Sequence, residues 1–209
     1  MDVTEQQPPS DTLIESDYNR VKEGKAECYF QKTSNQVFYN PIQEFNRDLS
    51  IAVLNTYSKT NNNKKLRILE ALAASGIRSM RYALEVENCV EIIANDFDKK
   101  AVELIDLNAR QNKVGNIVKS NFDDATVLMN TSYSKKELFD SIDLDPYGSP
   151  ASFLDSAVRT VKSGGMLLVT ATDAGVLCGN GADTCYTKYG KSRIKIALKI
   201  LGCQNIEYF

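Results

Sequence analysis

The sequence predicts an α/β fold in which helices cover both faces of a parallel sheet. From residue 66 onward, short apolar runs alternate with longer segments of helical periodicity. Each segment between two apolar runs is long enough for a crossover helix, and turn-forming or acidic residues end the runs. Strands and helices that alternate in this way build a parallel, doubly wound sheet, which binds its ligand where the strand order reverses.

The amino-terminal part is expected to be separate from this alternation. Residues 1–17 are polar and acidic and include a Pro-Pro pair, which predicts a disordered tail. Residues 18–58 are expected to form a hairpin and a helix that line the site. Strands are predicted at 24–30 and 36–39, with a polar turn between them, and a helix at 43–57. We expect one face of that helix to be buried, and its apolar residues are Ile42, Phe45, Leu49, Ala52 and Val53.

Residues 59–209 are expected to form the main domain. Predicted strands lie at 66–72, 90–96, 116–120, 139–144 and 166–173, and 205–209 begins another. Predicted helices lie at 77–85, 99–111, 125–130, 152–162 and 193–201. Gly164-Gly165 is expected to stop the fourth of these helices and Gly202 the fifth.

The amino-acid composition excludes several classes of function. The chain of 209 residues carries a net charge of −2, so it is not a cationic nucleic-acid binder as a whole, although Lys and Arg cluster near residues 59–67 and 188–199. It lacks histidine, which excludes Ser-His and Cys-His catalysis, and its five cysteines show no metal-binding spacing, so we expect no metal. No apolar run is long enough to span a membrane and no signal core is present. We therefore expect an intracellular protein, in the nucleus or cytoplasm, with the mitochondrion as an alternative.

The segment after the predicted strand 139–144 is the strongest functional signal. Asp145-Pro146-Tyr147-Gly148 places a carboxylate, a rigid turn residue and an aromatic ring where the strand ends. A carboxylate that accepts from an N–H and a ring that stacks can together hold a planar amine. The alternative is a strand that ends in a simple turn, with Asp145 as a cap.

Three earlier strand ends add to this signal. The loop at residues 71–76 is built from small residues, while Asp96 and the pair Asp124-Ala125 follow the next two strands. Neither GxGxxG nor a Walker A lysine is present, so no phosphate cradle is indicated. Each acid alone is more often a helix cap. Together they indicate a site for ribose and adenine without phosphate, which describes S-adenosyl-L-methionine.

Arg47 and Arg78 are candidates to bind the methionine carboxylate of such a cofactor. Arg47 lies in the helix before the first strand of the sheet, and Arg78 follows Gly76 by two residues. A guanidinium group can fix a carboxylate with two hydrogen bonds. The alternative is that both arginines lie on the surface.

The motifs together resemble the tRNA (guanine-N2) dimethyltransferases that act on guanosine 26 of tRNA. The resemblance covers roughly residues 23–189 and rests on Phe38-Tyr39-Asn40-Pro41, Asn46-Arg47-Asp48, Ala71 to Arg78, Asn95-Asp96, Asp124-Ala125, Asp143 to Pro150 and Thr170 to Asp173. It implies a Rossmann-like sheet of the class I S-adenosylmethionine-dependent methyltransferases, with tRNA as partner. It also implies that Arg47, Arg78, Asp96, Asp124 and Ala125 hold the cofactor.

For the substrate, the resemblance implies that Asp145, in the Asp145-Pro146-Tyr147 motif, accepts from the guanine amine. Phe38 and Tyr147 would stack on the flipped base. Two departures from the family pattern are present: the segment after Gly190 is shortened and lacks a Cys-His-Glu element, and we expect the final strand and an RNA-contacting domain to be missing. The alternatives are an amino-methyltransferase for another base and a non-catalytic RNA-binding or scaffold protein of the same fold.

Overall fold

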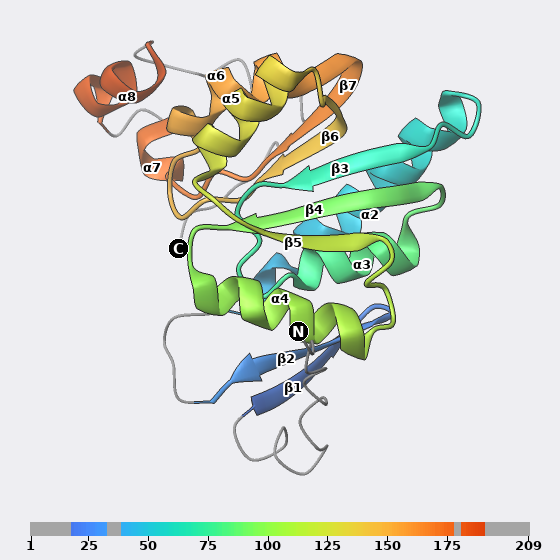
Figure 1. Cartoon of the computed structure of the whole chain (residues 1–209). Coiled ribbons are helices and arrows are strands. Elements are labelled where there is room, and N and C mark those ends of the chain that lie inside the picture. The colour runs from blue at the N-terminus through green and yellow to red at the C-terminus, as the bar shows by residue number, and fades with distance from the viewer. Residues whose placement is uncertain (1–17, 33–38, 178–180, 191–209) are drawn as a thin grey trace, which may run out of the picture.

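A computed structural model describes residues 18–32, 39–177 and 181–190 and contains a parallel five-stranded sheet (Figure 1). The sheet order is β5-β4-β3-β6-β7, and every neighbouring pair is parallel. The strands are β3 Leu66–Glu70, β4 Cys89–Asp96, β5 Val118–Phe122, β6 Phe139–Leu144 and β7 Val161–Val169. The doubly wound α/β fold predicted from the sequence is confirmed.

Helices pack on both faces of the sheet (Figure 1). One face is covered by α2 (Glu44–Thr60), α3 (Ile77–Glu85) and α4 (Lys99–Gln111), and the other by α5 (Ala125–Lys135) and α6 (Ala151–Thr160). Two short helices, α7 (Ala174–Leu177) and α8 (Ala182–Tyr189), follow the last strand and were not predicted.

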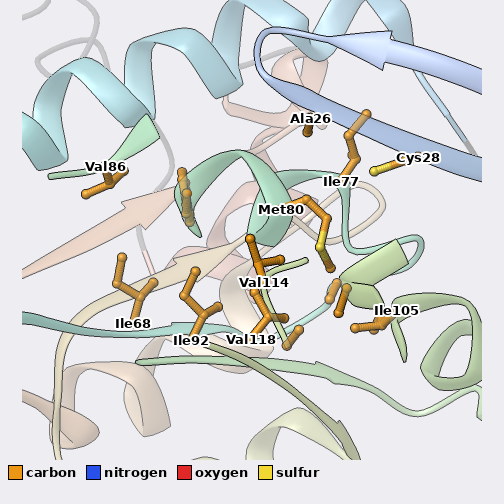
Figure 2. Close-up of a cluster of buried hydrophobic side chains, with 14 of the residues drawn as sticks. Ala26, Cys28, Ile68, Ile77, Met80, Val86, Ile92, Ile105, Val114 and Val118 are labelled. Atoms are coloured by element: carbon orange, nitrogen blue, oxygen red, sulfur yellow. The ribbon is translucent and has the colours of Figure 1, made fainter. Parts of the chain in front are cut away.

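Side chains that alternate in direction along the strands build a hydrophobic core on each face of the sheet. On β3, Ile68 points into the larger cluster and Leu69 into the smaller one, because successive side chains leave a strand on opposite sides. Figure 2 shows the larger cluster, in which Ile68 and Ile92 lie below Met80 of α3. Strands buried on both faces usually carry apolar residues in succession, as β3 does with Leu66, Ile68 and Leu69. β6 is buried along its whole length although Asp140, Ser141 and Asp143 interrupt its apolar residues.

The order of the strands reverses next to β3. The chain passes from β3 to β4 and β5 on one side and then returns to place β6 on the other side of β3. The carboxyl ends of β3 and β6 therefore flank the crevice in which a doubly wound sheet binds its ligand.

The amino-terminal part contains a hairpin, but its first strand was not predicted. β1 (Tyr18–Glu23) pairs with β2 (Ala26–Gln31) in antiparallel fashion, and the turn lies at Gly24-Lys25. Gly24 has φ +54°, and a Cβ there would lie 2.4 Å from Glu85 Oε1, so the glycine starts a tight turn and not a strand. The predicted strand 36–39 lies almost entirely outside the described residues.

The buried face of α2 also differs from the prediction. Ile42 and Phe45 are 84% and 71% exposed, and Leu49 is exposed as well. The buried side of α2 instead contains Arg47, Ile51, Leu54 and Ser58. The prediction failed because this helix is docked in part by a buried ion pair, which apolar periodicity does not reveal.

The remaining differences concern element boundaries. β7 begins at Val161, so Gly164-Gly165 lies inside a strand with a register shift and does not stop a helix. β3 ends at Glu70, two residues earlier than expected, and α5 continues to Lys135, five residues later. The predicted helix 193–201 and strand 205–209 lie outside the described residues. Within the described residues, no helix has the length and apolar character needed to cross a membrane.

Candidate functional site

A cavity of about 690 Å³ opens where β3, β4 and β6 end. This volume lies within the usual range for small-molecule sites. Six of the residues singled out from the sequence line it, namely Arg47, Arg78, Asp96, Asp145, Pro146 and Tyr147. The structure thus brings together residues that are up to 100 positions apart in the chain.

The small-residue loop after β3 forms one wall of the cavity. Ala73 N–H donates to the carbonyl of Asn95 at 2.8 Å, and the buried Asn95 amide donates to the Ala71 carbonyl at 3.0 Å. Ala74 (φ +48°) and Gly76 (φ +73°) let the loop curl tightly into α3. A Cβ on Gly76 would lie 3.0 Å from Ile105, so the loop also approaches α4 closely.

Asp96 ends β4 and fixes the same loop. Its Oδ2 accepts from the Ala74 N–H at 2.8 Å and its Oδ1 accepts from the Asp98 N–H at 2.9 Å. A carboxylate has about four acceptor positions, so two remain for a ligand. The side chain can therefore shape the loop and still accept from ribose hydroxyls.

Arg78 lies among three carboxylates at the switch point of the sheet. Its Nη2 is 2.5 Å from Asp145 Oδ2, its Nη1 is 3.3 Å from Asp143 Oδ2 and its Nε is 3.9 Å from Glu70 Oε1. The guanidinium is buried, so these interactions are little screened by water. The structure thus joins a predicted cofactor residue to the predicted catalytic carboxylate, and the contact of Arg78 with cofactor stays a prediction.

Glu70 and Asp143 are the most deeply buried acids of this group. Burial raises the pKa of Glu70 to about 8, although Arg78 and the Ser79 hydroxyl oppose the rise. Burial also raises the pKa of Asp143, which accepts from Tyr82 Oη at 2.5 Å. Both acids therefore hold a proton more readily than exposed carboxyls do, because they are buried around a single guanidinium.

Arg47 lines the cavity, but its guanidinium pairs with Glu23 of β1. Arg47 Nε and Nη2 lie 2.6 Å and 2.5 Å from the two Glu23 oxygens, and Nη2 also donates to the Asn40 carbonyl. Burial opposes ionisation of Glu23, but hydrogen bonds from Arg47 and Arg81 outweigh it and lower the pKa of Glu23. The bidentate pair docks α2 on the hairpin, and the predicted contact of Arg47 with cofactor stays a prediction.

The segment after β6 forms the opposite rim of the cavity. Tyr147 is 84% exposed, and its neighbour Gly148 pairs with the chain after β7 through two hydrogen bonds. The Gly148 N–H donates to Thr172 Oγ1 at 3.0 Å, and the Thr172 N–H donates to the Gly148 carbonyl at 2.9 Å. Tyr147 therefore stands on a braced turn at the mouth of the site.

Two predicted site residues in the described part of the chain are not among those that line the cavity. Asp124 is the N-cap of α5 and accepts from the Thr126 and Val127 N–H groups, which is the cap role weighed as its alternative. Ala125 is the first residue of that helix and is buried in the smaller core cluster. Phe38 lies outside the described residues. The predicted roles of all three stay predictions.

Sequence reasoning missed several lining residues. Phe97 follows Asp96 directly and is largely exposed at the cavity, while Phe153 and Ser149 reach it from the start of α6 and the turn before it. Glu70 was predicted to lie within the strand 66–72, and its role in the acid cluster was not recognised. Its position as the last residue of a strand was the available signal, because strand carboxyl ends form the crevice.

These features define the structural class to which the protein belongs. A parallel sheet with this order, a small-residue loop after its central strand and acids at neighbouring strand ends is the Rossmann-like fold of the S-adenosylmethionine-dependent methyltransferases. The sequence profile of the N2,N2-dimethylguanosine tRNA methyltransferase family matches residues 17–199. The chain belongs to this family, as the resemblance of its motifs had indicated.

Individual relatives agree. The tRNA (guanine(26)-N(2))-dimethyltransferase of Mus musculus is 39% identical over 253 aligned positions, which cover 97% of this chain and 37% of the relative. The mitochondrial enzyme of that name from Saccharomyces cerevisiae is 40% identical, and the match covers 83% of this chain and 38% of the relative. The solved structure of the complex of Trm1 from Pyrococcus horikoshii with S-adenosyl-L-methionine matches with a TM-score of 0.75 and 38% identity, covering 84% of this chain and 48% of that one. The chain thus spans less than half the length of each of these relatives.

Metal binding has no visible basis in the part of the chain that the structure describes. Residues 18–32, 39–177 and 181–190 contain no group of three or more His, Cys, Asp or Glu side chains that could hold a metal ion.

Proposed function

We propose that this chain transfers methyl groups from S-adenosyl-L-methionine to the exocyclic N2 of guanosine 26 in tRNA. Membership of the family and the names of its relatives support this activity. The observation that carries it is Asp145, held by Arg78 at the edge of the cavity beside the exposed ring of Tyr147. The proposal extends to an intracellular location, where tRNA is processed.

The cavity suits the proposed cofactor. Asp96 retains acceptor positions for the ribose hydroxyls, and the loop at Ala73-Ala74 lets a ligand approach the backbone. Phe97 offers an aromatic surface next to Asp96. Asp143 and Asp145 both face the guanidinium of Arg78, so the site can accommodate the positive charge of a sulfonium. When bound there, S-adenosyl-L-methionine supplies the methyl group.

The substrate base must leave the helical stack to reach this site. N2 of a paired guanine lies inside the duplex, so an enzyme that modifies it has to flip the nucleotide out. The ring of Tyr147 is a stacking surface at the mouth of the cavity, and stacking contributes about 1–3 kcal/mol per base. We propose Phe38 as the second stacking residue on the strength of the family motif.

Asp145 would orient the amine for transfer. Arg78 bonds to Asp145 Oδ2, which fixes the carboxylate and leaves Oδ1 to accept from the guanine N2–H. This bond turns the nitrogen lone pair out of conjugation and stabilises the positive charge that develops on the amine. The proton becomes acidic as the new bond forms, so a weak base is sufficient, and the absence of histidine from the chain does not prevent the reaction.

The test is a methyl-transfer assay on a tRNA transcript with guanosine at position 26. We expect N2-methylguanosine and then N2,N2-dimethylguanosine in the nucleoside digest, and we expect no product from a transcript with adenosine at that position. Asp145→Ala should abolish product while leaving the binding of S-adenosylhomocysteine intact. A different methylated base would identify another amino-methyltransferase, and failure to bind the cofactor would favour the scaffold alternative.

A further inference from the structure

We propose that Tyr189 is a positioning residue, which holds the turn after Asp145 in the geometry that methyl transfer requires. This inference rests on the proposed function. Tyr189 ends α8, a helix that was not predicted and that contributes no residue to the lining of the cavity. It nevertheless reaches the Asp145 to Pro150 turn through a direct hydrogen bond.

The Tyr189 hydroxyl joins two segments that flank the site. Its oxygen lies 2.7 Å from Ser149 Oγ and 2.9 Å from each oxygen of Asp173. A tyrosine hydroxyl has one proton, and a carboxylate can only accept, so Tyr189 donates to Asp173 and accepts from Ser149. Lys188, the preceding residue, adds an ion pair with Asp173 at 3.5 Å. The two hydroxyl groups and the carboxylate thus form a series of hydrogen bonds, each donating to the next, from the turn to the segment after β7.

The hydrogen-bonded series Ser149–Tyr189–Asp173 adds to backbone hydrogen bonds that already join the turn to the segment after β7. Gly148 and Thr172 already exchange two hydrogen bonds one residue away. The Thr170 N–H bonds to the Leu144 carbonyl at 2.9 Å, which continues the pairing back to the end of β6. The Ser149–Tyr189–Asp173 chain is the side-chain link at the far end of this ladder, where the turn enters α6.

The turn matters because it carries Tyr147, the proposed stacking residue. A shift of the turn backbone would move the Tyr147 ring, which lies at the mouth of the cavity. Asp145 is anchored by Arg78 on one side of the ring, and Ser149 is anchored by Tyr189 on the other. Loss of the second anchor would let the turn shift while the cofactor wall, built from other elements, stays in place. A displacement of about 1 Å at a reacting group can lower a rate about 100-fold.

The test compares Tyr189→Phe with Tyr186→Phe in the whole chain. Tyr189→Phe removes one hydroxyl and keeps the ring, and Tyr186→Phe makes the same change at an exposed position of the same helix. We expect Tyr189→Phe to lower kcat on tRNA about tenfold. Its affinity for S-adenosylhomocysteine should stay within about twofold of wild type, since a positioning role spares binding. Tyr186→Phe should match wild type in both.

Two further measurements separate positioning from a general structural effect. Amide hydrogen exchange in the peptide that spans residues 145–151 should become faster in Tyr189→Phe and unchanged in Tyr186→Phe. Adding Ser149→Ala to Tyr189→Phe should lower kcat by a smaller factor than Ser149→Ala does in wild type, because both changes remove the hydrogen bond between Ser149 and Tyr189.

The outcomes are distinct. Unchanged exchange or unchanged kcat in Tyr189→Phe overturns this proposal, and so does a loss confined to cofactor affinity. Failure of the proposed function would appear in the wild type itself, as absence of methyl transfer to tRNA, whatever the exchange comparison shows.

Discussion

Replacement of Arg78 by glutamine tests whether the acid cluster depends on its one central cation. Arg78→Gln would leave Asp145, Asp143 and Glu70 near one another without the guanidinium that now lies 2.5 Å, 3.3 Å and 3.9 Å from them. Removing one partner of a buried pair typically costs about 3–5 kcal/mol, because the remaining charge is desolvated and uncompensated. Part of that cost is avoided where the acids take up protons, so we expect a loss of about 3 kcal/mol.

The assay is urea unfolding at neutral pH, with Arg159→Gln as control. Arg159 pairs with Asp155 on the surface of α6, where their side chains are 57% and 79% exposed. Exposed pairs contribute about 0–1 kcal/mol, so the control should differ little from wild type. A loss below about 1 kcal/mol for Arg78→Gln would refute the reasoning, because it would show that the acids need no buried cation.

Three further changes have expected outcomes. Glu70→Gln should flatten the pH dependence of the unfolding free energy. Burial raises the pKa of Glu70 to about 8, so the native wild type keeps a proton on Glu70 that the unfolded chain loses above about pH 4.5. The unfolding free energy of the wild type should therefore fall by up to about 1.4 kcal/mol per pH unit between about pH 4.5 and pH 8. Gly76→Ala should destabilise the chain by about 1–2 kcal/mol in urea unfolding, because φ is +73° and Ile105 leaves little room; an unchanged midpoint would contradict the close approach. Asp124→Ala should cost about 1 kcal/mol through the lost cap of α5, and weaker binding of S-adenosylhomocysteine in the same variant, measured by calorimetry, would support its predicted contact with adenine.

The sheet could be predicted from the sequence because short segments that contain apolar residues alternate with segments of helical periodicity. The run at 139–144 matched β6 at both ends, and α4 began and ended where its periodicity indicated. Strand carboxyl ends meet at one edge of a parallel sheet, so the amino-acid sequence alone was enough to assign Asp96 and Asp145 to one site.

The parts that could not be predicted depend on contacts between distant residues. The buried face of α2 contains Arg47, paired with Glu23, beside Ile51 and Leu54, and apolar periodicity does not reveal a buried charged residue. Gly164 and Gly165 are typical of a helix end, but sheet pairing placed them in β7. The link from Tyr189 to Ser149 spans 40 positions and could not be recognised from either local sequence.

The central claim is that the cavity at the switch point binds S-adenosylmethionine, and a thermal melt with S-adenosylhomocysteine tests it most directly. Saturation at about 100 times Kd adds about 2.7 kcal/mol, which for a domain of this size raises Tm by about 5–10 °C. The account predicts this rise in wild type and in Asp98→Ala, whose side chain caps α4 beside the cavity, and its loss in Asp96→Ala. A folded wild type whose Tm does not respond to the ligand would contradict the account.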